Sequence, residues 1–307
     1  MEIKVWGSRG SIPVPGPGTN KFGGNTSCVT VAIDDLFIIF DAGTGIRSFG
    51  NWLIRNKKKL CGSLFFTHFH WDHIQGFPFF MPVYSPETKL NIYGHDTTGT
   101  LLNKILKGQM DPPFFPVGIE MMGGQMIFSD FSTKKSIDIK SKSKTLARIK
   151  SKSLRHPGGS VGYRLEDIES GKTFVYATDT EHADIPDENL IHLAQDADVL
   201  FYDAQYTTEE YYGLNGQLPK KDWGHSTWKE GLKIAEAAGV KDLFLFHHDP
   251  NHDDDMLLRM ENAAQTYLKQ NNTRFTKLNS VQMVYEGLVI KMPADLNKTI
   301  KTFNKKT

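Results

Sequence analysis

A short segment crowded with histidines places the strongest constraint on this chain. Residues 64–66 form an apolar run that indicates a buried strand, and four polar side chains follow closely: His68, His70, Asp72 and His73. Imidazole and carboxylate groups are ligands for zinc and also suit manganese or iron. Because alternate residues of an extended segment point the same way, His68 and His70 can reach one ion. Asp72 and His73, one turn further on, can reach a second ion beside it, so the segment predicts a two-ion site at a strand end.

Three further ligand candidates lie far downstream, each at one end of a strand-like run: His156, Asp179 and His247. Alone, each of them would more often be a buried or loop residue with an ordinary partner. Their shared position at strand ends, downstream of the histidine run, favours one common metal site.

These motifs resemble the metallo-β-lactamase superfamily of binuclear hydrolases, and the resemblance covers essentially the whole chain. It implies two divalent metal ions, zinc in first place, with manganese or iron as alternatives. One ion would be held by His68, His70 and His156, and the other by Asp72, His73 and His247, with Asp179 bridging them. The resemblance also implies a catalytic role for Asp72.

The order of the elements predicts an α+β protein. Strands dominate the first part of the chain, and strands with helices between them follow, which fits two sheets packed face to face. The resemblance implies the same αββα sandwich of two mixed β-sheets with helices outside. No linker or low-complexity segment interrupts the sequence, so we expect a single domain over residues 1–307.

Composition excludes several other classes of protein. The hydrophobic fraction is 39% and the charged fraction 23%, and no apolar run approaches the roughly 20 residues that cross a bilayer. The first residues read as a strand rather than a signal peptide. The only two cysteines, Cys28 and Cys61, lack ligand spacing and are typical of reduced thiols. We therefore expect a cytoplasmic protein with no membrane partner.

One local excess of charge departs from the overall balance of +1. Between Lys134 and Arg155 the chain carries nine basic residues and only Asp138 against them. A solvated hairpin face is one interpretation. The other is a basic strip that attracts a phosphate-bearing ligand toward His156.

A second motif indicates which reaction within the superfamily this chain would catalyse. The sequence Trp223-Gly-His-Ser-Thr227 precedes a helix, and Asp203 ends a buried strand upstream. His225 and Asp203 resemble the histidine and its acidic partner in the ribonuclease Z group, the phosphodiesterase branch of the superfamily. The alternative is that this segment only caps the helix. With two ions lowering the pKa of a shared water to give an attacking hydroxide, His225, oriented by Asp203, would protonate the leaving oxygen as general acid.

The substrate is predicted from what the chain lacks. Enzymes of this group that mature transfer RNA carry a long arm between the third histidine and the bridging aspartate, but only 22 residues separate His156 from Asp179. The segments 6–11, 23–27 and 247–250 resemble a bacterial and phage subgroup that includes cyclic nucleotide phosphodiesterases. We therefore predict a small cyclic phosphodiester, in first place a 3′,5′-cyclic nucleotide. The alternatives are a ribonuclease Z-like nuclease that acts on nucleic acid, a phosphodiesterase for another cyclic phosphate, and a non-enzymatic metal-binding sensor. A homodimer is implied by the resemblance alone.

Two further interpretations stay open at this level. The segment Asp111–Val117, with prolines beside Phe114 and Phe115, is either a lid over the site or ordinary packing on the core. Asp41, at the end of an apolar run, either orients a metal-bound imidazole or forms a turn.

Overall fold

Two seven-stranded β-sheets form the centre of the computed structural model, which describes residues 1–95, 102–131 and 136–293. The first sheet has the strand order β14 (Val289–Lys291), β1 (Glu2–Gly7), β2 (Cys28–Ile33), β3 (Leu36–Phe40), β4 (Cys61–Phe65), β5 (Lys89–Gly94) and β6 (Gln125–Asp130). The second has the order β13 (Ser280–Met283), β12 (Asp242–Phe246), β11 (Val199–Asp203), β10 (Thr173–Ala177), β9 (Ser160–Asp167), β8 (Lys144–Leu154) and β7 (Ile137–Ser141).

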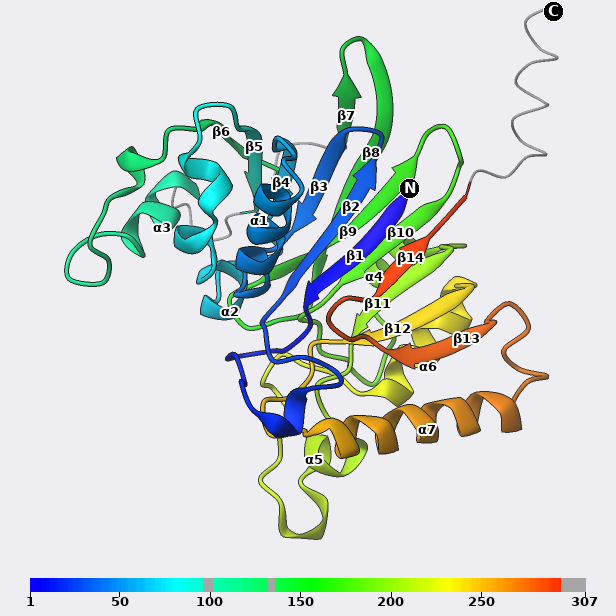
Figure 1. Cartoon of the computed structure of the whole chain (residues 1–307). Coiled ribbons are helices and arrows are strands. Elements are labelled where there is room, and N and C mark those ends of the chain that lie inside the picture. Colours follow the sequence, from blue (N-terminus) through cyan, green and yellow to red (C-terminus); the bar gives the residue numbers. More distant parts are fainter. Residues whose placement is uncertain (96–101, 132–135, 294–307) are drawn as a thin grey trace, which may run out of the picture.

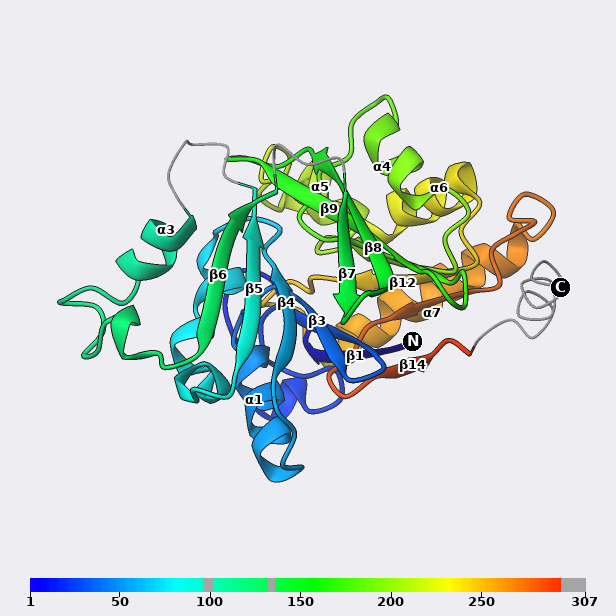
Figure 2. The same cartoon turned by 90° about the horizontal axis from the view of Figure 1, so that it is seen from above.

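Helices cover the outer face of each sheet (Figures 1 and 2). Those on the side of the first sheet are α1 (Gly45–Arg55), α2 (Trp71–Ile74) and α3 (Leu102–Gly108). Those on the side of the second are α4 (Glu188–Ala194), α5 (Thr208–Tyr212), α6 (Trp228–Ala238) and α7 (Asp254–Gln270). Short 3₁₀ helices occur in the connections: η1 (Pro17–Thr19), η2 (Phe77–Phe79), η3 (Met81–Tyr84), η4 (Ile119–Met121) and η5 (Leu214–Gly216). The predicted αββα sandwich of two mixed sheets is confirmed.

Three apolar clusters hold these layers together. The central one lies between the sheets, where the ring of Phe40 on β3 contacts Tyr163 and Phe174 on the second sheet. The two outer clusters lie under the helices, for example at Phe49 of α1 and Leu232 of α6. Each fully buried large apolar side chain contributes roughly 1.5–3 kcal/mol. Burial on both faces explains why β3, with the sequence LFIIF, is apolar throughout.

Capping residues fix the helix starts that the sequence predicts. Thr227 caps α6 by accepting a hydrogen bond from the backbone N–H of Glu230, and Asp253 caps α7 in the same way. Gly239, at φ 68°, ends α6 in the left-handed conformation. Two details differ from what the sequence predicts. The residue pattern predicts a helix over residues 185–194, but α4 begins three residues later, where Asp187 provides the cap. The prolines of segment 77–82 predict no regular element there, but the segment forms η2 and η3.

Some predictions fall on residues outside the described part of the chain. The helix predicted over residues 97–107 begins among them, and only its second half is described, as α3. The start of the basic segment, at Lys134, also lies outside. No helix within the described ranges is both long and apolar enough to cross a membrane.

Candidate metal centre

The seven predicted ligands come together where strands of the two sheets end. Strand β4 is followed by the segment that carries His68 and His70, and α2 carries the next two ligands. His156 follows β8, and the last two ligands follow β10 and β12. Parallel pairing of β3 with β4, and of β10 with β11 and β12, brings the carboxyl ends of these strands to a common edge. The sheet topology thus assembles residues that are far apart in the sequence.

Three site residues leave their strands in an unusual backbone conformation. Asp41, Asp179 and His247 have φ values of 59°, 55° and 64°, which is the left-handed region that non-glycine residues rarely adopt. Such conformations persist only where the surrounding structure enforces them, and they gather at functional sites. Here they occur directly after β3, β10 and β12.

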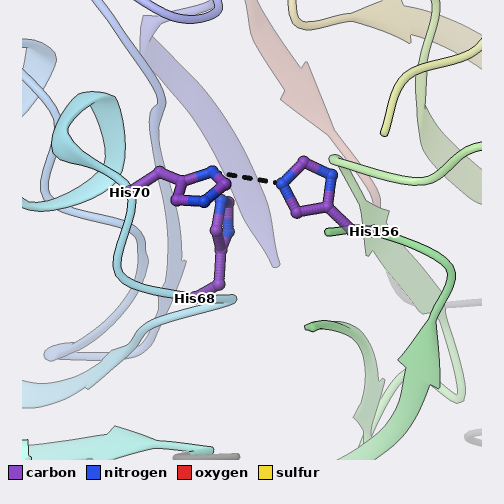
Figure 3. A group of neighbouring side chains, drawn as sticks. All are labelled: His68, His70 and His156. Atoms are coloured by element: carbon purple, nitrogen blue, oxygen red, sulfur yellow. Dashed lines mark hydrogen bonds between the residues drawn. The ribbon is translucent and has the colours of Figure 1, made fainter. Parts of the chain in front are cut away.

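His68, His70 and His156 form a group that we name the three-histidine cluster (Figure 3). Their rings converge, and Nε2 of His156 lies 3.1 Å from Nδ1 of His70. His68 is buried, and its Nε2 has no hydrogen-bond partner among the described residues. A buried nitrogen without a partner is costly unless another group, such as a metal ion, accepts its lone pair.

Asp72, His73, Asp179 and His247 form a second group, the carboxylate cluster, in which every side chain is buried. Nε2 of His73 lies 3.3 Å from Oδ2 of Asp72, and Nε2 of His247 lies 3.1 Å from the same oxygen. The backbone N–H of Ser11 also donates to Asp72, at 2.7 Å. The carboxylate is therefore fixed from two sides.

Asp179 contacts both clusters. Its Oδ1 lies 3.6 Å from Nε2 of His68 and 3.4 Å from Nε2 of His247, and its Oδ2 lies 3.2 Å from Nε2 of His73. The hydroxyl of Thr178 donates to Oδ2 at 2.6 Å. This position between the clusters is the one that a bridging carboxylate needs.

Hydrogen bonds to the second ring nitrogen orient three of the imidazoles. Nδ1 of His73 lies 2.8 Å from Oδ2 of Asp41, which resolves the open alternative for Asp41 in favour of an orienting acceptor. In the same way, Nδ1 of His247 lies 2.9 Å from Oε1 of Gln205. Donation from Nδ1 turns Nε2 toward the site, and in the neutral ring Nε2 carries the lone pair that a metal ion needs.

His156 is oriented by the backbone. Its Nδ1 lies 2.9 Å from the carbonyl oxygen of Gly224. Gly224 has φ 92°, and a Cβ there would lie 2.3 Å from His156 Nδ1, so only glycine fits without displacing the ring. Sequence reasoning assigned no role to Gln205 or Gly224. The available signal was their position beside Asp203 and His225.

The pKa values of the histidines shift in opposite directions in the two clusters. Burial and the neighbouring His73 hold the pKa of His68 well below its usual value. Burial would also lower the pKa of His73 and His247, but Asp179 and Asp72 outweigh it, so the pKa of His73 is well above its usual value and that of His247 is raised to about 9. In return, these imidazoles hold the pKa of both carboxyl groups well below their usual range, against the effect of burial.

The donor set fits two divalent ions. Each cluster offers at least three nitrogen or oxygen atoms within 4.8 Å of one another, and the shared Asp179 joins them. Ionised carboxylates and imidazoles with a free Nε2 are the forms that bind zinc, manganese or iron. The predicted ligand set is therefore consistent in chemistry, and its assignment to metals remains a proposal.

His225 lies between the two clusters. Its ring centroid is 5.3 Å from that of His156 and 4.8 Å from that of His247. Nδ1 lies 2.8 Å from Oδ2 of Asp203, a buried carboxylate whose other oxygen accepts from the backbone N–H of Ser226 at 3.1 Å. Helix capping is performed by Thr227, so it does not account for His225.

A cleft of about 420 Å³ opens beside His156. Its lining includes two cationic side chains, Arg155 and Lys221, and two acidic ones at the surface, Asp184 and Asp222. Tyr211 and Tyr212 supply aromatic surface. With the buried Glu181, three acidic side chains face two cationic ones, and the cleft is large enough for a small organic group.

The structure also describes two other features that the sequence singled out. Phe115 packs on Phe79, with 5.4 Å between ring centroids, whereas Phe114 is 71% exposed, so part of the segment Asp111–Val117 packs and its role as a lid stays a prediction. The basic segment forms β7 and β8, and three of its cations pair with acids: Lys144 with Glu169, Arg148 with Asp138 and Lys150 with Glu166. This pairing favours the solvated hairpin face.

The remaining histidines in the described part of this edge have protein partners. Nε2 of His248 lies 2.7 Å from the carbonyl oxygen of Val284, and Nε2 of His252 lies 2.8 Å from Oε1 of Glu210. Nδ1 of His182 lies 2.9 Å from the hydroxyl of Ser226. These contacts connect loops and give the three rings structural roles.

Comparison with known proteins agrees with this site. Residues 37–248 match the family model of the Beta-lactamase superfamily domain. A ribonuclease Z of Picrophilus torridus is 26% identical, over 92% of this chain and 98% of the relative. The metallo-beta-lactamase fold protein YhfI from Bacillus subtilis is 18% identical with a TM-score of 0.64, covering 94% of this chain and 98% of its own. A diphosphatase from the PhnP family is 19% identical with a TM-score of 0.64, covering 95% and 98%.

Fold, site and relatives together define the class: the chain is a metal-dependent hydrolase that works with divalent metal ions. Within that class it belongs to the beta-lactamase superfamily, because the family model matches more than half of its length. The relatives also confirm the predicted ribonuclease Z-like branch.

Proposed function

We propose that this hydrolase is a phosphodiesterase that cleaves a small cyclic phosphodiester, in first place a 3′,5′-cyclic nucleotide. The observation that carries the proposal is the pair His225 and Asp203 beside both ligand clusters. Activation of water alone would need only the metal ligands and not an additional imidazole, His225, that a carboxylate holds in place beside them. An alkoxide leaving group, such as a ribose oxygen, needs a proton donor.

The ligand assignment follows the geometry. The three-histidine cluster would hold one ion and the carboxylate cluster the other, with Asp179 shared and zinc as the first choice. Bound there, divalent ions supply Lewis-acid stabilisation of a phosphoryl oxygen and lower the pKa of water. Asp41, Gln205 and Gly224 keep the imidazoles in the orientation that this requires.

Proton transfer belongs to His225 in this mechanism. Asp203 accepts from Nδ1, which fixes the orientation of the ring. Nε2 then faces the site between His156 and His247 and gives its proton to the leaving oxygen. The backbone N–H groups of Gln205 and Ser226 hold Asp203 through its other oxygen, so the carboxylate keeps its place during transfer.

The size and charge of the surroundings support a small substrate. His156 and Asp179 are connected by the hairpin of β9 and β10, whose turn spans only residues 168–172, so nothing projects there to hold a long RNA. The cleft beside His156, with three acidic and two cationic side chains, offers little attraction to a polyanion, which binds through many cationic contacts.

A second candidate is a nuclease that acts on RNA. It is favoured by the relatives, since the Picrophilus torridus protein is a ribonuclease Z that matches over nearly its whole length. The missing arm between His156 and Asp179 argues against this candidate.

A substrate panel separates the two candidates. The purified protein, supplied with Zn²⁺ or Mn²⁺, is assayed against 3′,5′-cyclic nucleotides, 2′,3′-cyclic nucleotides and a transfer RNA precursor. We expect a 3′,5′-cyclic nucleotide to be hydrolysed with the highest kcat/KM. Efficient 3′ cleavage of the precursor, with no turnover of cyclic nucleotides, would replace the first proposal with the second.

A further inference from the structure

Glu181 is a buried carboxylate that neither ligand cluster uses. It exposes 6% of its surface and lies in the wall of the cleft beside His156. Three donors point at it: the hydroxyl of Tyr211 at 2.7 Å and the backbone N–H of Asp222 at 2.6 Å reach Oε1, and the backbone N–H of Gly224 at 3.0 Å reaches Oε2. Both oxygens are therefore engaged within the protein, which leaves Glu181 no evident role in binding substrate directly.

The backbone groups that donate hydrogen bonds to Glu181 belong to the segment that orients His156 and carries His225. Gly224 accepts from Nδ1 of His156 through its carbonyl oxygen and directly precedes His225. The backbone N–H of Glu181 also donates to the carbonyl oxygen of Arg155 at 2.7 Å, next to His156 in the chain. One residue thus fixes the segment before His156 and the segment before His225.

Few other contacts restrain the segment Asp222–Gly224: the backbone N–H of Trp223 donates to the carbonyl oxygen of Lys220 at 3.2 Å, and Nδ1 of His156 bonds the carbonyl of Gly224. Asp222 has a φ value of 69°, in the left-handed region, and Trp223 is 48% exposed. Such a backbone at a residue other than glycine persists only when its surroundings enforce it. The buried carboxylate of Glu181 provides this enforcement through two backbone N–H groups.

We propose that Glu181 is a positioning residue that sets the placement of both His156 and His225. The inference rests on the proposed function for its kinetic consequence. Through Gly224, the carboxylate keeps the His156 ring turned for metal binding and keeps His225 at the leaving oxygen. Through Tyr211, it connects this arrangement to the wall of the cleft.

The substitution Glu181→Gln tests the proposal with almost no change in shape. An amide has one accepting oxygen and one donating NH₂ group, so it cannot accept from donors on both sides. An NH₂ group would then face an N–H group of the segment Asp222–Gly224, which would move away. The matched control is Glu261→Gln on α7, whose carboxylate also accepts from a backbone N–H, that of Met283 at 2.7 Å, outside the metal centre.

Two readouts are expected to change in Glu181→Gln. Titration of metal-free protein with Zn²⁺ should show about tenfold weaker binding at one site, in the range typical for residues that orient ligands. At saturating Zn²⁺, kcat for a cyclic nucleotide should fall about 10–100-fold, and kcat for a nitrophenyl phosphodiester, which needs no proton donor, much less. Glu181→Asp, which keeps two accepting oxygens, should recover part of both losses.

These measurements distinguish a failure of the proposal for Glu181 from a failure of the proposed phosphodiesterase function. Wild-type metal affinity in Glu181→Gln, together with equal losses or no loss on the two substrates, would overturn the positioning role. If the wild-type protein hydrolyses neither substrate, the proposed function fails, and the Zn²⁺ titration alone still decides on Glu181. If Glu181→Gln does not fold, the same measurements on Glu181→Asp decide the question.

Discussion

The two ligand clusters are neighbours, yet they are built differently. The three-histidine cluster has no carboxylate of its own, and one of its rings, His70, is exposed beside the cleft. The carboxylate cluster is wholly buried and carries Asp72 and Asp179. Two carboxylates can neutralise the charge of a divalent ion, whereas three neutral imidazoles cannot. We therefore propose that the carboxylate cluster would be the firmer metal site and that the three-histidine cluster would depend on the shared Asp179.

The strongest test of this dependence is Asp179→Ala. The substitution removes the only contact between the clusters that both would use, so both sites should lose metal. Activity should fall by roughly 10⁴-fold or more, because each ion contributes several kcal/mol of transition-state stabilisation. Elemental analysis and hydrolysis assays measure both effects, with the exposed Asp255→Ala as control. Retention of two ions would contradict the shared role.

The substitution His225→Ala tests whether the ring between the two clusters is a general acid or a metal ligand. As a general acid, His225 should matter in proportion to the need of the leaving group for a proton. We expect hydrolysis of a cyclic nucleotide to fall about 10²–10⁴-fold, and that of a nitrophenyl phosphodiester much less, with metal content unchanged. Asp203→Asn should follow the same pattern more mildly. Loss of an ion would instead make His225 a ligand.

Asp41→Asn perturbs the carboxylate cluster directly, through His73, and reaches His68 of the three-histidine cluster only through Thr67. The amide keeps the shape of the side chain but weakens the hydrogen bond from Nδ1 of His73, which also loses a charged partner. Metal affinity should fall about 10–100-fold at one site, while the other site keeps its affinity within a few-fold. Calorimetric titration resolves the two sites, and equal weakening of both would remove the distinction between the clusters.

The pH dependence of metal binding should also differ between the clusters. The raised pKa values of His73 and His247 mean that these imidazoles are protonated at pH 7 before an ion binds, so binding must release their protons. Affinity at the carboxylate cluster should then fall as the pH falls, by about tenfold per pH unit for each proton released. The lowered pKa values of His68 and His70 predict a weaker dependence at the three-histidine cluster between pH 7 and 6. Titrations at both pH values measure the difference.

Sequence patterns predicted the ligand candidates and missed the hydrogen bonds that orient them. The spacing from His68 to His73 and the strand-end positions of His156, Asp179 and His247 were enough to anticipate the residues that come together. The sandwich followed from the order of elements and from the resemblance. The single domain over residues 1–307, the cytoplasmic location and the homodimer stay predictions.

The missed residues share a physical reason. Gln205, Gly224 and Glu181 act through side-chain hydrogen bonds to partners between 30 and 68 positions away along the chain, and no periodicity or motif records such contacts. The sequence around Glu181 does not indicate whether its carboxylate faces solvent or accepts hydrogen bonds from three donors inside the protein. Only the folded backbone distinguishes these cases.

The central claim is that this edge of the sandwich is a two-ion phosphodiesterase site. Metal-free protein is titrated with Zn²⁺ or Mn²⁺ while bound metal and hydrolysis of a nitrophenyl phosphodiester are measured in the same samples. The account predicts that activity rises with bound metal and reaches its plateau at two ions per chain. Full activity in protein that carries only trace metal would contradict it.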